Sequence, residues 1–425
     1  MRSSYCRLCK SNRGKYKRKL KIQSIALCKN SVTLSSLHLR PLVGMVDKKD
    51  LKSFGPCVRP GSSPGEATKI NNFMKVHIIG GGIIGLSTAY HLAKHCDITV
   101  YEKDNSYKLS SFARSCGGFR SQFFTPINVD MSRYSIDFIK NQTDVDFVDN
   151  GYLMLFGNNQ QWDHDRSIET QKTHGATTIS LTPEQVKQYF PQLYVDDLYR
   201  GCITMDQSEG WLDPIALHNW FKKKAQQRGV EIVYKDGLEV DHTSTDRIVI
   251  ACGCWTNEVA KHFNINVPVK GHKHTVFNVS TQIEQISHLP LVADLVTGVY
   301  LRPEGDGYIV GYDGNGEWSS DNLEPNYNSW DEVWEHLFYR FPKVFDAAKM
   351  EGAWAGYYDT STIDNNAIID YVDNVYFATG FTGRGLMHSP AVGLTLMQMI
   401  LNEKLTFNIE PYKLNRNPNF EKYVI

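Results

Sequence analysis

The chain has 425 residues, of which 41% are apolar and 22% charged, and its formal net charge is zero. A length above about 100–200 residues per domain predicts two intertwined domains behind an amino-terminal tail. A neutral chain lacks the basic face that a nucleic-acid partner requires. Nine cysteines are too few for a disulfide framework, and the lone pair Cys6 and Cys9 predicts no metal site. No run reaches the roughly 18 apolar residues of a membrane span.

Residues 1–74 differ in composition from the rest of the chain. They contain no Asp or Glu before Asp47, are rich in Ser, and carry a basic run at Lys15–Lys19. Acid-poor, basic and Ser-rich segments are typical of mitochondrial presequences. We therefore predict a disordered leader and linker that directs the protein to the mitochondrial matrix or to the inner-membrane face. The alternative is translation that starts at Met45 or Met74, and a start at Met74 would leave a cytoplasmic protein.

Folded structure is predicted to begin at residue 75 with a β-α-β unit. The short run Val76–Ile79 predicts a buried strand, and Gly80–Gly85 predicts a tight turn. Helical periodicity follows over Leu86–His95, and Ile98–Tyr101 predicts a second strand that ends at Glu102. Strand, turn, helix and strand fit between Val76 and Glu102, in fewer than about 30 residues, as one such unit does.

The glycines of this turn predict a dinucleotide site. Gly80 permits the turn, Gly82 lets a pyrophosphate approach the backbone, and Gly85 lets the helix pack on the strands. A phosphate would then lie at the helix amino terminus, beside Ile83 and Ile84. Glu102, followed by Lys103, stands about 20 residues downstream, where a carboxylate binds an adenosine ribose. FAD and NAD both remain open from this pattern, and a Gly-rich turn without a ligand is the structural alternative.

Further elements are predicted along the rest of the chain. Asp213–Pro214 has the residue types of a helix cap and a first helical position. The predicted helices are residues 130–140, a helix from Thr182, residues 215–228 and a closing helix from Ser389, and the predicted strands are residues 151–156, 231–234, 247–251, 267–279, 298–312 and 375–378. Between the last strand and the last helix, glycines 380, 383 and 385 would place backbone N–H groups and a helix start against an anion.

Three further segments resemble one family of flavoproteins, the glycine and D-amino-acid oxidase family. They are Ser110–Gly118, Ile248–Trp255 and Phe377–Gly385, and they occur in the family's order after the glycine turn. The resemblance implies FAD as the cofactor. The residues that it assigns to FAD, beyond those of the turn, are Ser110, Ser111, Arg114, Ser115, Gly117, Gly118, Ala251, Gly253, Trp255, Gly380, Thr382, Gly383, Arg384 and Gly385.

Departures from the family pattern refine this expectation. Sarcosine oxidase-like members attach the flavin through a Cys, but the equivalent stretch Gly356–Thr360 has none, which implies non-covalent FAD. Ile309 stands where those oxidases carry a Lys that helps reduced flavin react with oxygen. Met387, or its neighbour, replaces a Lys that binds the substrate carboxylate. The resemblance therefore implies a dehydrogenase more than an oxidase.

The resemblance also indicates the substrate-contacting residues. Arg120 corresponds to an Arg that binds a substrate carboxylate in sarcosine oxidase-like members, and a surface or FAD-adjacent Arg is the alternative. Arg302, Tyr357 and Tyr358 are further candidates. His272, Lys273 and His274 line the cavity in one interpretation and form a solvated strand face in the other.

Together these observations predict an α/β (α+β) fold. A Rossmann-type FAD-binding domain from the discontinuous segments 75–125, 200–265 and 350–415 carries an inserted, mostly antiparallel substrate domain of residues 126–199 and 266–349, and residues 416–425 form a tail. The predicted function is oxidation of the C–N bond of a small amine or amino acid, of N-methyl glycine or D-amino-acid type, by hydride transfer to flavin N5. The electron acceptor is open.

A narrower resemblance, carried by Glu209–Pro214, Leu291–Asp294 and Trp354–Asp359, is to a mitochondrial branch of the family associated with respiratory complex I assembly. It implies the alternative function, which is a flavin-containing assembly or scaffold factor with little or no turnover. The partners would then be mitochondrial inner-membrane complexes.

Overall fold

The computed structural model describes residues 73–204, 208–422 and 424. The predicted leader thus lies outside the described residues. Within the part of the chain that is described, no helix is long and apolar enough to cross a membrane.

The predicted β-α-β unit forms the centre of a six-stranded sheet. The strands are β1 (Met74–Ile79), β2 (Cys96–Tyr101), β9 (Glu231–Val233), β10 (Arg247–Ile250), β17 (Ile368–Val372) and β18 (Val375–Thr379), in the order β17-β18-β10-β1-β2-β9. All neighbours are parallel except β17 and β18. Three segments far apart in the sequence therefore build one Rossmann-type sheet, as predicted.

Helices cover both faces of this sheet because its strands alternate between two apolar cores. Val76, Ile78 and Val249 pack on one face, together with α1 (Ile83–Leu92), α2 (Pro126–Gln142), α5 (Pro214–Gln227) and α8 (Gly385–Ile400). Ile79 and Ile248 point to the other face, where α6 (Thr256–Lys261) packs.

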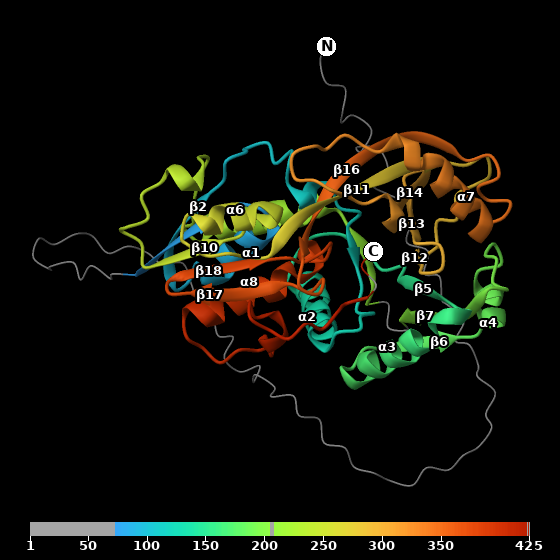
Figure 1. The fold of residues 1–425 in the computed structure, drawn as a ribbon, viewed down its shortest axis with the longest axis horizontal. Coiled ribbons are helices and arrows are strands. Elements are labelled where there is room, and N and C mark those ends of the chain that lie inside the picture. The colour runs from blue at the N-terminus through green and yellow to red at the C-terminus, as the bar shows by residue number, and fades with distance from the viewer. Residues whose placement is uncertain (1–72, 205–207, 423, 425) are drawn as a thin grey trace, which may run out of the picture. The chain divides into compact units, whose positions relative to one another are not determined.

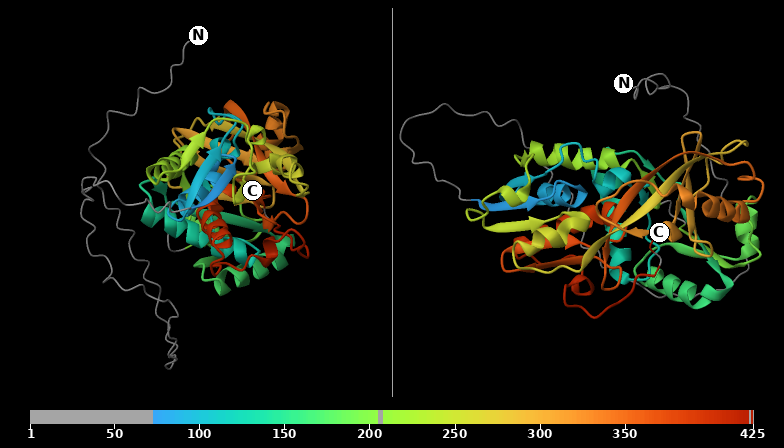
Figure 2. Two further views of the ribbon diagram at one scale, coloured as in Figure 1. Left: turned by 90° about the vertical axis from the view of Figure 1, so that its left-hand side faces the viewer. Right: turned by 45° about the horizontal axis from the view of Figure 1, so that its top comes forward.

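A second, nine-stranded sheet is mostly antiparallel. Its order is β15-β11-β14-β13-β12-β5-β7-β6, with β16 paired to β11. The bounds are β5 (Tyr152–Gly157), β6 (Thr178–Leu181), β7 (Leu198–Thr204), β11 (Val269–Ser280), β12 (Leu291–Asp294), β13 (Val299–Glu304), β14 (Gly307–Tyr312), β15 (Glu317–Trp318) and β16 (Lys349–Ser361). The long strands β11 and β16 run from the first sheet toward the second (Figure 1, Figure 2).

The two faces of the second sheet have different neighbours. Leu153, Val292 and Leu301 face a core that includes α4 (Pro183–Tyr189) and α7 (Trp330–Arg340). Tyr152, Leu291 and Tyr300 point to the opposite face, where α3 (Gln161–Thr173) contributes Ile168. A small sheet of β3 (Gly118–Phe119), β8 (Gly210–Leu212) and β4 (Phe147–Val148) positions the segment that contains Arg120.

Several element boundaries differ from the predicted ones. Helix α1 begins at Ile83, directly after Gly82, and α2 begins at Pro126. The closing helix α8 begins at Gly385, not at Ser389, and it contains Pro390. Pro390 has no N–H for the carbonyl of Leu386, and the Ser389 hydroxyl donates to that carbonyl instead, at 2.8 Å. The proline therefore lies inside the helix and does not start it.

The predicted carboxy-terminal tail is partly buried. Arg416 forms a buried ion pair with Asp364 at 2.5 Å. The Glu421 side chain is 1% exposed and accepts hydrogen bonds at the start of α2 from the amides of Phe124 and Thr125, both at 3.0 Å. These contacts fasten residues 416–421 to Asp364, which precedes β17, and to the segment that leads into α2.

Candidate functional site

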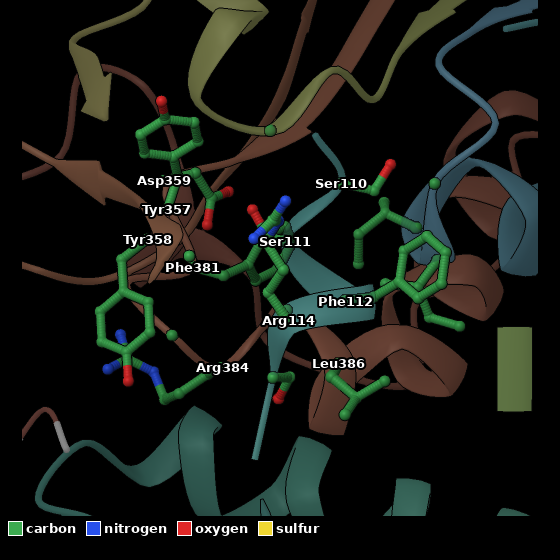
Figure 3. Close-up of a pocket in the computed structure, with 18 of the residues that line it drawn as sticks. Ser110, Ser111, Phe112, Arg114, Tyr357, Tyr358, Asp359, Phe381, Arg384 and Leu386 are labelled. Atoms are coloured by element: carbon green, nitrogen blue, oxygen red, sulfur yellow. The ribbon is translucent and has the colours of Figure 1, made fainter. Parts of the chain in front are cut away.

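One cavity extends from the carboxyl ends of β1 and β2 to the inner face of the nine-stranded sheet. Figure 3 shows Tyr357, Tyr358 and Asp359 on one side of it and Ser110 and Phe112 on the other. The sequence-predicted residues that line it are Gly80, Gly82, Ile83, Ile84, Glu102, Lys103, Ser110, Ser111, Arg114, Ser115, Gly118, Arg120, Ala251, Gly253, Trp255, Tyr357, Tyr358, Gly383, Arg384 and Gly385.

Five predicted residues lie outside the lining. Four of them shape the backbone: a Cβ on Gly85 would lie 1.9 Å from the Gly80 carbonyl oxygen, and Gly117, Gly380 and Thr382 have φ values of 76°, 72° and 50°. Arg302 forms contacts elsewhere, since its Nε donates to the Cys116 carbonyl at 2.8 Å and its guanidinium pairs with Glu304.

The glycine turn presents an open anion site. Gly80 has a φ of 104°, which favours glycine, and a Cβ on Gly82 would meet no atom within 4 Å. Helix α1 has no side-chain cap and no acidic residue in its first turn. Its free N–H groups and its dipole therefore favour an anion in the cavity.

The peptide unit of Gly81 is held from both sides. Its N–H donates to Glu102 Oε2 at 2.8 Å, and its carbonyl lies 3.0 Å from His218 Nε2. Burial raises the pKa of Glu102, although the amides of Asp104 and Gly81 oppose that shift. His218 comes from α5 and stacks on Phe112 with ring centroids 4.0 Å apart. Sequence reasoning missed His218 because 137 residues separate it from Gly81.

Asp359 is a second buried group that sequence reasoning missed. It lines the cavity at the end of β16. Burial raises its pKa to about 6, while hydrogen bonds from the backbone of Phe381 and Gly380 act in the opposite direction. The carboxylate thereby holds the Gly-rich loop that precedes α8. Tyr358 packs on the same loop, because its ring lies 2.8 Å from where a Cβ on Gly383 would be.

The far end of the cavity is cationic and lined by hydroxyl groups. Arg120 and Arg384 are both 3% exposed, and Tyr152, Tyr300 and Tyr358 line the same end. Arg120 Nη1 donates to the Gln122 carbonyl. Guanidinium groups and tyrosine hydroxyls in an enclosed space are suited to binding a carboxylate.

The two histidines of β11 have different environments. His274 lines the cavity, and burial lowers its pKa to about 3. His272 lies 3.0 Å from it, ring nitrogen to ring nitrogen, and stacks on Trp318. Lys273 is not part of the lining: its Nζ pairs with Glu317 at 2.9 Å. Of the three residues, the cavity interpretation thus holds for His274.

The positions that differ from the family's lysines lie near this end. Met387 lines the cavity. Ile309 does not, but it shares a face of β14 with Gly311, where a Cβ would lie 2.0 Å from the Tyr300 ring. Among the described residues that line the cavity, the one lysine is Lys103. It follows Glu102 and lies 5.5 Å from the Trp255 ring centroid.

Comparison with known proteins relates this geometry to a family. Residues 75–399 match the model of a family described as FAD dependent oxidoreductase. The chain is 30% identical over 411 residues to FAD-dependent oxidoreductase domain-containing protein 1 of Bos taurus, covering 80% of this chain and 84% of the relative. It is 24% identical over 392 residues to the mitochondrial sarcosine dehydrogenase of Homo sapiens, covering 83% of this chain and 42% of that protein. Among solved structures, L-proline dehydrogenase from P. horikoshii matches with a TM-score of 0.72 and 27% identity, over 80% of this chain and 97% of that one.

Proposed function

Because this chain belongs to the family of FAD-dependent oxidoreductases, we propose that it oxidises the C–N bond of a small amine or amino acid, as a dehydrogenase. The observation that carries the proposal is the continuity of the cavity. One end has the glycine turn and Glu102, and the other has Arg120 and the tyrosines. A dinucleotide cofactor and a carboxylated amine can therefore occupy the same space end to end.

The residues at the first end fit FAD. The open space at Gly82 and the uncapped start of α1 suit a pyrophosphate, and the Glu102 carboxylate suits a ribose. The cavity-lining thiols, Cys116 and Cys252, have pKa values raised by burial, that of Cys252 to about 12. A thiol with a raised pKa is a poor nucleophile, which supports non-covalent binding.

The chain's own residues position the substrate. Bound FAD would supply the two-electron acceptor for oxidation of the C–N bond, and the imine product would hydrolyse in water. Arg120 would bind the substrate carboxylate, while Tyr300 and Tyr358 enclose the reacting end. His274 is neutral near pH 7, because burial lowers its pKa to about 3, and so leaves the amine without a competing charge.

The experiment is anaerobic reduction of the purified flavoprotein by a panel of N-methyl glycines and D-amino acids, followed by absorbance. We expect bleaching by at least one of them, and turnover that an artificial acceptor supports better than air. Fast peroxide production would contradict the dehydrogenase assignment. No bleaching by any amine, together with stable association with inner-membrane complexes, would favour the scaffold function. That function stays open because Ile309 and Met387 stand where oxidases of the family carry lysines.

A substitution at Ile309 tests the acceptor assignment directly. Ile309→Lys should raise the rate at which reduced flavin reacts with oxygen by roughly 10²-fold, because a cation there stabilises the negative charge that develops on oxygen. Ile309→Met, which is neutral, is the matched control and should leave that rate unchanged. Equal oxygen rates in the two variants would contradict the role assigned to this position.

A further inference from the structure

Arg384 has a hydrogen-bonding group that the rest of the described chain does not satisfy. Its side chain is 3% exposed and lines the cavity. Nη2 donates to the Asn365 carbonyl, but Nη1 has no hydrogen-bond partner among the residues that the structure describes. Figure 3 shows the side chain on the side of the cavity where Tyr358 lies. A buried charged donor without an acceptor is costly, so this geometry points to a ligand acceptor.

The carboxylates nearest to this end have other partners. Glu209 accepts from the Ser121 amide at 2.6 Å and from Gln122 Nε2 at 2.8 Å. Glu421 accepts at the start of α2, and Asp359 accepts from the loop that precedes α8. Among the described residues, no hydrogen bond or ion pair joins any of these three carboxylates to Arg384.

Arg384 also belongs to a concentration of positive charge. The guanidinium carbons of Arg120 and Arg384 lie 4.1 Å and 5.9 Å from the centroid of the same ring, that of Phe123. Arg384 is the N-cap residue of α8, whose start adds positive potential. Two guanidinium groups and a helix start at one end of a cavity favour a ligand with more than one negative charge.

We propose that Arg384 binds a second carboxylate of the substrate, so that the enzyme prefers amines with two carboxylates, such as an N-carboxyalkyl amino acid or an amino dicarboxylic acid. Arg120 binds the first carboxylate, and the C–N bond lies between the two. The inference rests on the proposed function and names its substrate class. The competing role for Arg384 is contact with the cofactor, which the experiment below separates.

The test uses two thioethers in which sulfur replaces the amine nitrogen, so that binding is measured without turnover. Methylthioacetate has one carboxylate and thiodiacetate has two. Each is titrated into the FAD-loaded protein, and binding is followed by the change in flavin absorbance. We expect thiodiacetate to bind at least about 10-fold more tightly, because a charge-assisted contact is worth about 10- to 100-fold in affinity.

Substitution assigns that preference to one residue. Arg384→Met keeps the length of the side chain and removes the charge, and it should weaken thiodiacetate by about 10- to 100-fold while methylthioacetate binds as before. Arg200→Met is the control, because Arg200 lies on β7 outside the cavity lining, and it should change neither affinity.

Four outcomes would overturn the inference. Equal affinity of the unmodified protein for the two thioethers overturns it and leaves the proposed function intact. Equal weakening of both thioethers in Arg384→Met also overturns it. Loss of FAD, or a shifted flavin midpoint potential, in that variant assigns Arg384 to the cofactor. Failure of both thioethers to bind the FAD-loaded protein would contradict the inference, and it would also contradict the proposal that the substrate is a carboxylated amine.

Discussion

At the scale of single residues, the space beside Gly82 is what the cofactor requires. Glu102 and His218 hold the neighbouring peptide from opposite sides, so the turn keeps its shape without help from a ligand. Gly82→Val should therefore fold but place its side chain where the pyrophosphate lies, and the purified protein should contain no FAD.

The matched control for this substitution is Gly352→Val. Gly352 lies on β16, and a Cβ there also meets no atom within 4 Å, but the residue is not part of the cavity lining. Its flavin content, measured by absorbance after denaturation, should equal that of the unmodified protein. Full flavin occupancy in Gly82→Val would show that the phosphate site lies elsewhere.

His218 predicts a pH dependence of stability. Burial lowers its pKa from 6.5 to about 4, so between these values the unfolded chain binds a proton that the folded chain does not. The free energy of unfolding should then fall as pH decreases from 6.5 toward 4, by at most about 1.4 kcal/mol per pH unit from this group. His218→Gln retains a donor for the Gly81 carbonyl but does not titrate, so its stability should fall less steeply.

Urea unfolding of the two proteins between pH 4 and pH 7 measures this difference. Comparison of the pair cancels the contributions of other groups, including Asp359, whose raised pKa acts in the opposite direction. His95→Gln is the control, because His95 is exposed and should leave the slope unchanged. Identical slopes for the unmodified protein and His218→Gln would contradict the assignment.

At the scale of elements, the segment that leads into helix α2 is held by a residue almost 300 positions away. The Glu421 carboxylate accepts from the backbone amides of Phe124 and of Thr125, which is the N-cap residue, and from Asn128 Nδ2 at 2.7 Å. Glu421→Gln should lower the free energy of unfolding by about 1–3 kcal/mol, because a buried charged acceptor is lost.

Glu403→Gln is the control for this contact, since Glu403 is exposed and its substitution should shift the unfolding midpoint little. Both variants can be compared with the unmodified protein by chemical denaturation in excess FAD. An unchanged midpoint in Glu421→Gln would mean that the hydrogen bonds to this carboxylate contribute nothing to stability.

At the scale of the whole molecule, the leader and the folded part make separate predictions. We propose that residues 1–73 direct the protein to mitochondria, which the mitochondrial location of the sarcosine dehydrogenase relative supports. A reporter fused to these residues should reach mitochondria, and replacing the basic residues of Lys15–Lys19 with Gln should prevent it. A diffuse cytosolic signal from the first fusion would favour translation from Met74.

The fold and the cofactor end of the site were largely predictable, because local rules determine them. Glycine spacing, a short apolar strand and an acidic residue about 20 positions later follow from the physics of one β-α-β unit. The family and FAD are confirmed by the comparison. His218 and Asp359 were not predictable in this way, since their roles arise from contacts across the sequence. Nor does sequence reveal that Ser389 compensates for Pro390 and lets α8 begin earlier.

The position of β18 and of Glu421 also sets an order of events during synthesis. Strand β10 lies between β1 and β18, so the central sheet stays incomplete until residue 379 has left the ribosome. The segment before α2 is fastened later still, because the amides of Phe124 and Thr125 donate to Glu421. A nascent chain that has reached only residue 400 therefore has every cavity-lining residue but lacks the side chain that holds the start of α2.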